Sequence, residues 1–227
     1  MWNKRVLTID VGNTTADLCL FEGEFKPLGK FSHFELPKVD ADLVLLSSVK
    51  PSVETYMKSL YPKARFIKPQ KVPIEASFPH KEKVGIDRLI NLYGALNLYG
   101  KDLIVVSAGT ALVIDLLVDG IFQGGFITIG IGTGIDCLSK RAELIPPIKL
   151  KDIRVDIGRN TEEALLGGSI KKAFYFVLGC LKDWEESYKR SLKVIITGGD
   201  GYILRDLGIY DPLLIHKGML ALAEKIP

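Results

Sequence analysis

Short apolar runs separated by glycine turns dominate the first third of the chain. The runs Arg5–Ile9, Ala16–Phe21 and Phe25–Phe31 follow one another, with turns at Gly12-Asn13 and at Gly23. Apolar runs joined by such tight turns predict an antiparallel meander of three strands.

The next segments predict a buried strand and two helices. Asp42–Val49 is almost entirely apolar, which is typical of a strand covered on both faces. Pro51 stands just before the segment Ser52–Leu60, where the first turn of a helix tolerates proline. A short strand is expected at Arg65–Ile67, and leucines three or four positions apart predict a helix over Gly85–Tyr99.

The same order of elements then begins again. Apolar runs recur at Leu103–Val106, Ala111–Val118 and Phe122–Ile129, with glycine turns between them. An offset of 97 residues lays Asp10 on Ser107 and Gly12 on Gly109. We interpret this as an internal duplication; two unrelated meanders are the alternative, because glycine turns between strands are common.

The remaining segments complete a two-part α/β protein. We expect helices at Ile135–Arg141, Thr161–Tyr188 and Pro212–Lys225, and a buried strand at Lys193–Ile196 that leads into a glycine-rich turn. The expected domains are residues 1–101 and 102–227, each a mixed five-stranded sheet with flanking helices.

Composition excludes several classes of protein. With 47% hydrophobic and 25% charged residues the chain is neither disordered nor fibrous, and a net charge of +3 argues against nucleic acid as a partner. The three cysteines, Cys19, Cys137 and Cys180, form no disulfide framework or zinc spacing, which favours the reducing cytoplasm. We expect neither a signal peptide nor a membrane span, because no apolar run is long enough.

The turn after the first strand combines groups that suit a phosphorylated ligand. Asp10 ends a buried strand, and Gly12, Asn13 and Thr14 follow it. Backbone N–H groups of such a turn can hold phosphate oxygens, and Asp10 is suited to hold Mg²⁺ through water. A plain hairpin turn explains Gly-Asn equally well, but not the aspartate and the threonines around it.

Two further segments carry candidate chemistry. The segment Gly85-Ile86-Asp87-Arg88 places a carboxylate, which can deprotonate a hydroxyl, beside a guanidinium, which can bind an anion. The alternative is that the acid only stabilises the start of a helix. Gly198 and Gly199 follow the strand near residue 196 and would let a flat ligand lie against the backbone, unless they serve only to turn the chain.

Other catalytic motifs are missing from the sequence. It contains no P-loop, no GxGxxG dinucleotide loop, no HExxH and no GxSxG. The histidines His33, His80 and His216 are scattered and predict neither a triad nor a metal site.

Taken together, these segments resemble the actin-like ATPase superfamily, and most closely its type III pantothenate kinases. Asp10–Thr14, Ser107–Ala111 and Thr197–Asp200 are similar to the superfamily's two phosphate motifs and its adenosine motif. Further segments are similar to signatures of the kinase family: Ser47–Pro51, Gly85–Arg88, Gly124–Gly130 and Asn160–Ala164. The resemblance implies two duplicated ribonuclease-H-like domains around a nucleotide cleft, and ATP-dependent phosphorylation of the pantothenate hydroxyl to 4'-phosphopantothenate, the first step of coenzyme A biosynthesis.

The resemblance also implies roles for individual residues. Asp87 would be the catalytic base, and Asp10 would organise Mg²⁺. The substrate pantothenate would be bound by Gly85, Ile86, Arg88, Thr161 and Phe78. ATP would be bound by Gly12, Asn13, Thr14, Gly109, Thr110, Gly198 and Gly199. Family members are homodimers, so a homodimer is expected.

The sequence departs from the family pattern at three positions. Ser107 stands where the family usually has an aspartate that helps to bind K⁺ or NH₄⁺; a hydroxyl can ligate such an ion without charge, which leaves the cation requirement open. Ile129 replaces a proline, and Phe78 stands where tyrosine is common. Two alternative functions follow: a non-catalytic regulatory relative of the same fold, or another small-molecule kinase of the superfamily.

Overall fold

The computed structural model describes residues 4–223 and 225. Contacts divide the chain into two compact units: one comprises residues up to Leu98 together with those from Leu213 onward, and the other comprises Tyr99–Pro212. The domain division expected at residues 101/102 remains a prediction. The units differ from it mainly in the final helix, which packs with the first unit.

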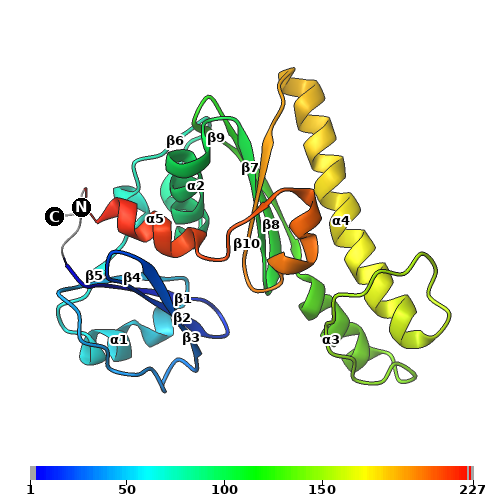
Figure 1. Ribbon diagram of the computed structural model, residues 1–227, viewed down its shortest axis with the longest axis horizontal. Coiled ribbons are helices and arrows are strands. Elements are labelled where there is room, and N and C mark those ends of the chain that lie inside the picture. The colour runs from blue at the N-terminus through cyan, green and yellow to red at the C-terminus, as the bar shows by residue number, and fades with distance from the viewer. Residues whose placement is uncertain (1–3, 224, 226–227) are drawn as a thin grey trace. The chain divides into compact units, whose positions relative to one another are not determined.

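The first unit is built on a mixed sheet. Its strands run in the order β3-β2-β1-β4-β5, with β1 antiparallel to β2 and parallel to β4 (Figure 1). These strands are β1 (Val6–Val11), β2 (Ala16–Phe21), β3 (Phe25–Phe31), β4 (Leu43–Ser48) and β5 (Arg65–Phe66). The predicted meander and the strand after it are therefore confirmed.

Alternation along β1 separates a hydrophobic core from a polar face. Leu7, Ile9 and Val11 are buried with Met57 of α1 (Glu54–Leu60), which follows a 3-10 turn at Pro51–Val53. Since successive strand residues point to opposite faces, Thr8 and Asp10 lie on the other face, against which α5 (Leu214–Leu222) packs. The alternation of side chains along β1 therefore places the carboxylate of Asp10 on the face of the sheet that α5 covers.

The other elements of this unit are one long helix and several short segments. α2 (Ile86–Tyr99) matches the predicted helix and crosses α5 closely, because a Cβ added at Gly94 would lie 3.1 Å from the Cα of Gly218. The short elements are η2 (Pro69–Lys71), β6 (Glu75–Ala76) and η3 (Lys81–Lys83).

The second unit repeats the strand order of the first. Its strands run β11-β10-β7-β8-β9, with β7 antiparallel to β8 and parallel to β10, as β1 is to β2 and β4 (Figure 1). They are β7 (Leu103–Ala108), β8 (Ala111–Val118), β9 (Ile121–Ile129), β10 (Lys193–Thr197) and β11 (Ile209–Tyr210). A matching order and direction of strands confirms the duplicated topology.

Two helices cover one face of this second sheet. Ile131 and Ile135 of α3 (Ile131–Arg141) and Leu166 and Ile170 of α4 (Thr161–Tyr188) share a core with β7 and β8. Among the described residues, α4 is the helix whose length and composition would allow it to cross a membrane, although its buried side chains belong to this core.

Some boundaries differ from the prediction for local reasons. α3 begins at Ile131 rather than Ile135, because Gly132 and Gly134 fall in the first turn of the helix, where the sequence favoured a loop. The final helix spans Leu214–Leu222 rather than residues 212–225. The 3-10 segment Gly201–Leu207 (η4) and the two-residue β11 are too short to leave a periodic pattern.

Candidate active site

Asp10 is a half-buried carboxylate near the end of β1. The Ser47 hydroxyl of β4 donates a hydrogen bond to its Oδ1 over 2.5 Å. Burial raises the pKa of Asp10 to about 6; the Ser47 hydrogen bond opposes this rise, and the charge of Asp87 adds to it. The charge of Asp87 therefore acts on Asp10, and both predicted acids belong to the first unit.

The loop after β1 presents the predicted phosphate-binding residues to solvent. Asn13 and Thr14 are exposed, and the Gly12 N–H donates to Thr15 O over 3.0 Å, which closes the turn. Two residues that the sequence analysis did not assign to the site contact backbone carbonyl oxygens of this turn.

Those two residues are His33 and Lys50. His33 Nε2 lies 3.0 Å from Gly12 O, and Lys50 Nζ donates to Asn13 O over 3.0 Å. Lys50 thus brings a positive charge to the loop. The segment Ser47–Pro51 already stood among the family signatures, but nothing local in the sequence pointed to His33.

Asp87 lies in the first turn of α2, where Gly85 makes room for it. A Cβ added at Gly85 would come within 2.6 Å of Asp87 Oδ1. Burial raises the pKa of Asp87, while a backbone hydrogen bond from Arg88 and the charge of Arg88 oppose the rise. A carboxylate with a raised pKa that is still close to a cation suits a general base.

The side chains near Asp87 differ in their exposure to solvent. Ile86 is only 5% exposed and belongs to the core, so only its backbone is available to a ligand. Arg88 and Phe78 are half-buried. Asp87 and Arg88 are therefore charged side chains of this segment that remain partly accessible to a ligand.

The paired acids fit a magnesium ion that is held only in part by protein. Asp10 and Asp87 both have raised pKa values, and a divalent cation would offset the repulsion that the charge of Asp87 exerts on Asp10. Within residues 4–223 and 225, no cluster of three or more His, Cys, Asp or Glu side chains could enclose a metal. This donor set is typical of Mg²⁺, which keeps several waters and takes further oxygens from substrate phosphates.

In the second unit, three loops meet at the end of β7. The N–H of Gly130 donates to Thr110 O over 3.0 Å, and the N–H of Asp200 donates to Ala108 O over the same distance. Gly198, at φ +92°, turns the chain there. The structure therefore brings the predicted residues of the second phosphate motif and of the adenosine motif into one cluster, which includes Ser107, Gly109, Thr110, Gly198 and Gly199.

The close packing of these loops predicts a stability effect at Gly130. A Cβ there would lie 1.9 Å from Gly109 O, so we expect Gly130→Ala to lower the free energy of unfolding by about 1–3 kcal/mol in denaturant titrations. Gly109→Ala is the matched control, because a Cβ at Gly109 meets nothing within 4 Å. Equal stability of the two variants would contradict the close approach.

The start of α4 explains most of the motif around Thr161. Asn160 Oδ1 accepts a hydrogen bond from the Glu163 N–H, and Glu163 Oε2 accepts one from the Arg159 N–H, both over 2.9 Å. This is a variant of the capping box. Asn160 and Glu163 thus have structural roles, whereas Thr161 is exposed at the first helical position.

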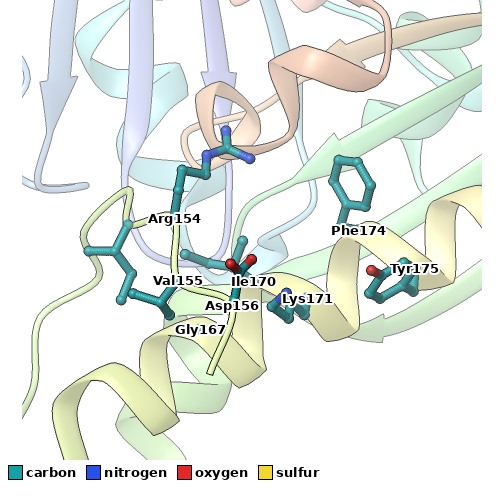
Figure 2. A pocket seen from close by; sticks show the side chains of 9 residues that line it. Arg154, Val155, Asp156, Gly167, Ile170, Lys171, Phe174 and Tyr175 are labelled. Carbon is teal, nitrogen blue, oxygen red and sulfur yellow. The ribbon is translucent and has the colours of Figure 1, made fainter. Parts of the chain in front are cut away.

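A separate pocket of about 230 Å³ lies beside α4 (Figure 2). It is lined by Arg154, Asp156, Lys171 and Tyr175, among others, and by none of the predicted site residues. Arg154 points away from α4 and pairs with Asp206 and Asp152. The pocket therefore takes no part in the site described above.

Comparison with solved structures defines the class of protein. A structure from Campylobacter jejuni, described as a Baf family transcriptional activator, is 22% identical with a TM-score of 0.69 and covers 96% of this chain and 97% of its own. A glucokinase from an Antarctic psychrotroph is 11% identical with a TM-score of 0.50, at 99% coverage of each chain. At these identities the likeness concerns the fold alone, which is that of the actin-like ATPases.

Sequence comparison defines the family. The model of the type III pantothenate kinase family matches residues 6–183. A type III pantothenate kinase of Aquifex aeolicus is 43% identical over 221 residues, which are 95% of each chain. The chain belongs to the type III pantothenate kinase family.

Proposed function

We infer that the protein transfers the γ-phosphoryl group of ATP to the hydroxyl of pantothenate, giving 4'-phosphopantothenate in the first step of coenzyme A biosynthesis. The observation that carries this inference is the acid pair of the first unit. Asp87, with a raised pKa, lies in the glycine-bordered start of α2, and its charge acts on Asp10, the acid suited to magnesium.

Asp87 acts as the general base in this proposal. Its carboxylate accepts the hydroxyl proton as the oxygen attacks the γ-phosphorus, and a carboxyl with a raised pKa is the stronger base. Arg88 binds the substrate or the transferred group, and Gly85 lets the substrate approach the backbone. Ile86 contributes through its backbone because its side chain is buried.

Charge neutralisation is assigned to Asp10 and to the exposed loops. Bound Mg²⁺ would supply positive charge to the phosphate oxygens, and Asp10 would hold it through water. We assign the triphosphate to Gly12, Asn13, Thr14, Gly109 and Thr110, and the adenosine to Gly198 and Gly199. The exposure of Asn13, Thr14 and Thr110 supports this assignment.

Two residues are proposed to complete the pantothenate site. Thr161 at the exposed start of α4 would bind the carboxylate, since a helix N-terminus favours an anion. Phe78 would contact the substrate with its half-buried ring. Ser107 would contact a monovalent cation by its hydroxyl, if one is used.

We also propose a cytoplasmic homodimer. The three cysteines are free, which suits a reducing compartment. Apolar rings gather on β9 and α4: Phe126 is 51% exposed and stacks on Trp184 at 5.6 Å, and Tyr175 is 62% exposed. A second copy of the chain would cover these rings.

The homodimer predicts a change in sedimentation. We expect the native protein to sediment as a dimer at micromolar concentration, and Tyr175→Asp to shift it toward monomer, because a charge would enter an apolar interface. Leu144→Asp is the control, since Leu144 is 92% exposed in a loop of the same unit. A monomeric native protein would contradict the proposal.

The function is tested by ADP release coupled to an optical assay. We expect steady ADP release that requires both pantothenate and Mg²⁺, measured with and without K⁺. Release that requires a sugar or acetate instead would indicate another kinase of the superfamily. The absence of release with every acceptor would indicate a non-catalytic relative.

A further inference from the structure

Two carboxylates face each other across β1 and β2. Asp10 and Asp17 are partners in the antiparallel ladder, so their side chains leave the same face of the sheet. Like charges in that position are destabilising. Burial raises the pKa of Asp10 most, and the charge of Asp17 adds to that rise. The pair therefore needs groups that offset its charge.

The negative charges of Asp10 and Asp17 have different neighbouring groups. Asp17 Oδ1 lies 3.6 Å from His216 Nε2, and Asp17 Oδ2 lies 4.0 Å from Lys30 Nζ. Asp10 Oδ1 accepts a hydrogen bond from the neutral hydroxyl of Ser47, and the charge of His216 also lowers the pKa of Asp10. Both oxygens of Asp17 thus have a basic neighbour, whereas the hydrogen bond to Asp10 Oδ1 comes from a neutral group.

Hydrogen bonds fix the orientation of the His216 ring. His216 is 1% exposed on α5, and its Nδ1 lies 2.8 Å from Thr8 Oγ1. Thr8 Oγ1 donates its single hydrogen to Cys19 O over 3.0 Å, so it accepts the hydrogen bond from His216 Nδ1–H. Nε2 has no hydrogen-bond partner in the described part of the chain and faces Asp17, whose Oδ1 lies 3.6 Å away.

We propose that His216 is a positioning residue: it holds Asp17 toward α5 and offsets its charge, so that Asp10 alone of the two acids directs Mg²⁺ to the phosphates. This proposal rests on the proposed function, because magnesium-ATP is the ligand. Without His216, Asp17 retains the exposed Lys30 as a basic neighbour, whose charge solvent screens; the charge of Asp17 beside Asp10 then repels the triphosphate and competes for the magnesium ion.

A set of three variants tests the proposal by binding of magnesium-ATP in titration calorimetry, without pantothenate. His216→Gln keeps a donor for Thr8 but cannot become a cation, and we expect its affinity to fall about tenfold. Asp17→Asn removes the charge that His216 offsets, so we expect an affinity within about threefold of the native value. The double variant should return to the same range, which a loss of packing at His216 would not do.

Lys30→Gln is the matched control, because Lys30 is the other basic neighbour of Asp17. Its side chain is 51% exposed, and solvent screens its charge, so we expect less than a twofold change in affinity. Thermal unfolding of each variant separates affinity from stability.

The proposal is overturned if His216→Gln binds magnesium-ATP as the native protein does, or if the double variant is as weak as His216→Gln. Should His216→Gln not fold, the double variant decides: folding with near-native affinity supports the proposal, and failure to fold or weak binding overturns it. A native protein that binds magnesium-ATP but does not phosphorylate pantothenate would contradict the proposed function and leave this result intact.

Discussion

Replacing Asp87 by asparagine is expected to lower kcat by about 10²–10⁴-fold, which is the usual contribution of a general base. The amide has the size of the carboxylate but cannot accept the hydroxyl proton. Because Gly85 leaves the pocket for this side chain intact, we expect ATP affinity to stay within about threefold of the native value. Single-turnover kinetics and calorimetry measure the two quantities separately.

Glu82→Gln provides the control for this prediction. Glu82 is an exposed acid of the preceding 3-10 turn that pairs with His80, so its loss should leave kcat nearly unchanged. Native turnover in Asp87→Asn would exclude Asp87 as the base. An equal loss in both variants would point to a general charge effect instead.

Replacing Asp10 by asparagine is expected to stabilise the free protein and to inactivate it. Burial holds the pKa of Asp10 at about 6, against an ordinary value of 3.8, so the native state binds this proton more tightly than the unfolded state does. Ionised Asp10 therefore costs stability at pH 7, and that cost disappears as the pH falls from about 6 to 4. At 1.36 kcal/mol per pKa unit the cost is about 3 kcal/mol at most.

The asparagine side chain carries no charge at any pH. The variant should therefore have a higher free energy of unfolding than the native protein at pH 7 and an equal one near pH 4. Denaturant titrations at the two pH values measure it, with Asp40→Asn as the control, because the Asp40 side chain is 96% exposed. Activity should fall about 10- to 100-fold, as for other residues that orient a metal through its outer shell. Equal stability of native and Asp10→Asn proteins at pH 7 would contradict the burial of a charged Asp10.

These two predictions describe one arrangement in which stability is given up for function. Strand alternation and the turn after β1 place Asp10 where water cannot solvate it fully, and Gly85 leaves room for the carboxylate of Asp87. We expect the free energy lost in the ligand-free protein to be recovered when a cation and an anionic substrate bind. Natural sites often show this exchange of stability for activity.

Much of the fold could be predicted because it is encoded locally. The meanders at Val6–Phe31 and Leu103–Ile129 follow from alternating runs and glycine turns, and the helix Thr161–Tyr188 follows from its length. The packing of α5 with the first unit could not be predicted, because it depends on contacts such as Gly94 with Gly218, far apart in sequence.

The residues of the candidate site also fall into those that the sequence predicts and those that it does not. Asp10, Asp87 and the glycine loops stand in contiguous motifs, which made them visible in the sequence. His33, Lys50 and His216 act across long sequence separations, through Gly12, Asn13 and Thr8 respectively. A single histidine on an apolar helix carries no sign of its partner in the sequence, so only the structure shows that His216 lies beside Asp17.

The ³¹P NMR spectrum of a reaction mixture tests the central claim most directly. With native protein, ATP, Mg²⁺ and pantothenate, we expect a new phosphomonoester signal that grows in step with ADP and is nearly absent with Asp87→Asn. ATP converted to ADP and inorganic phosphate without that signal, or a signal that grows equally fast with Asp87→Asn, would contradict it.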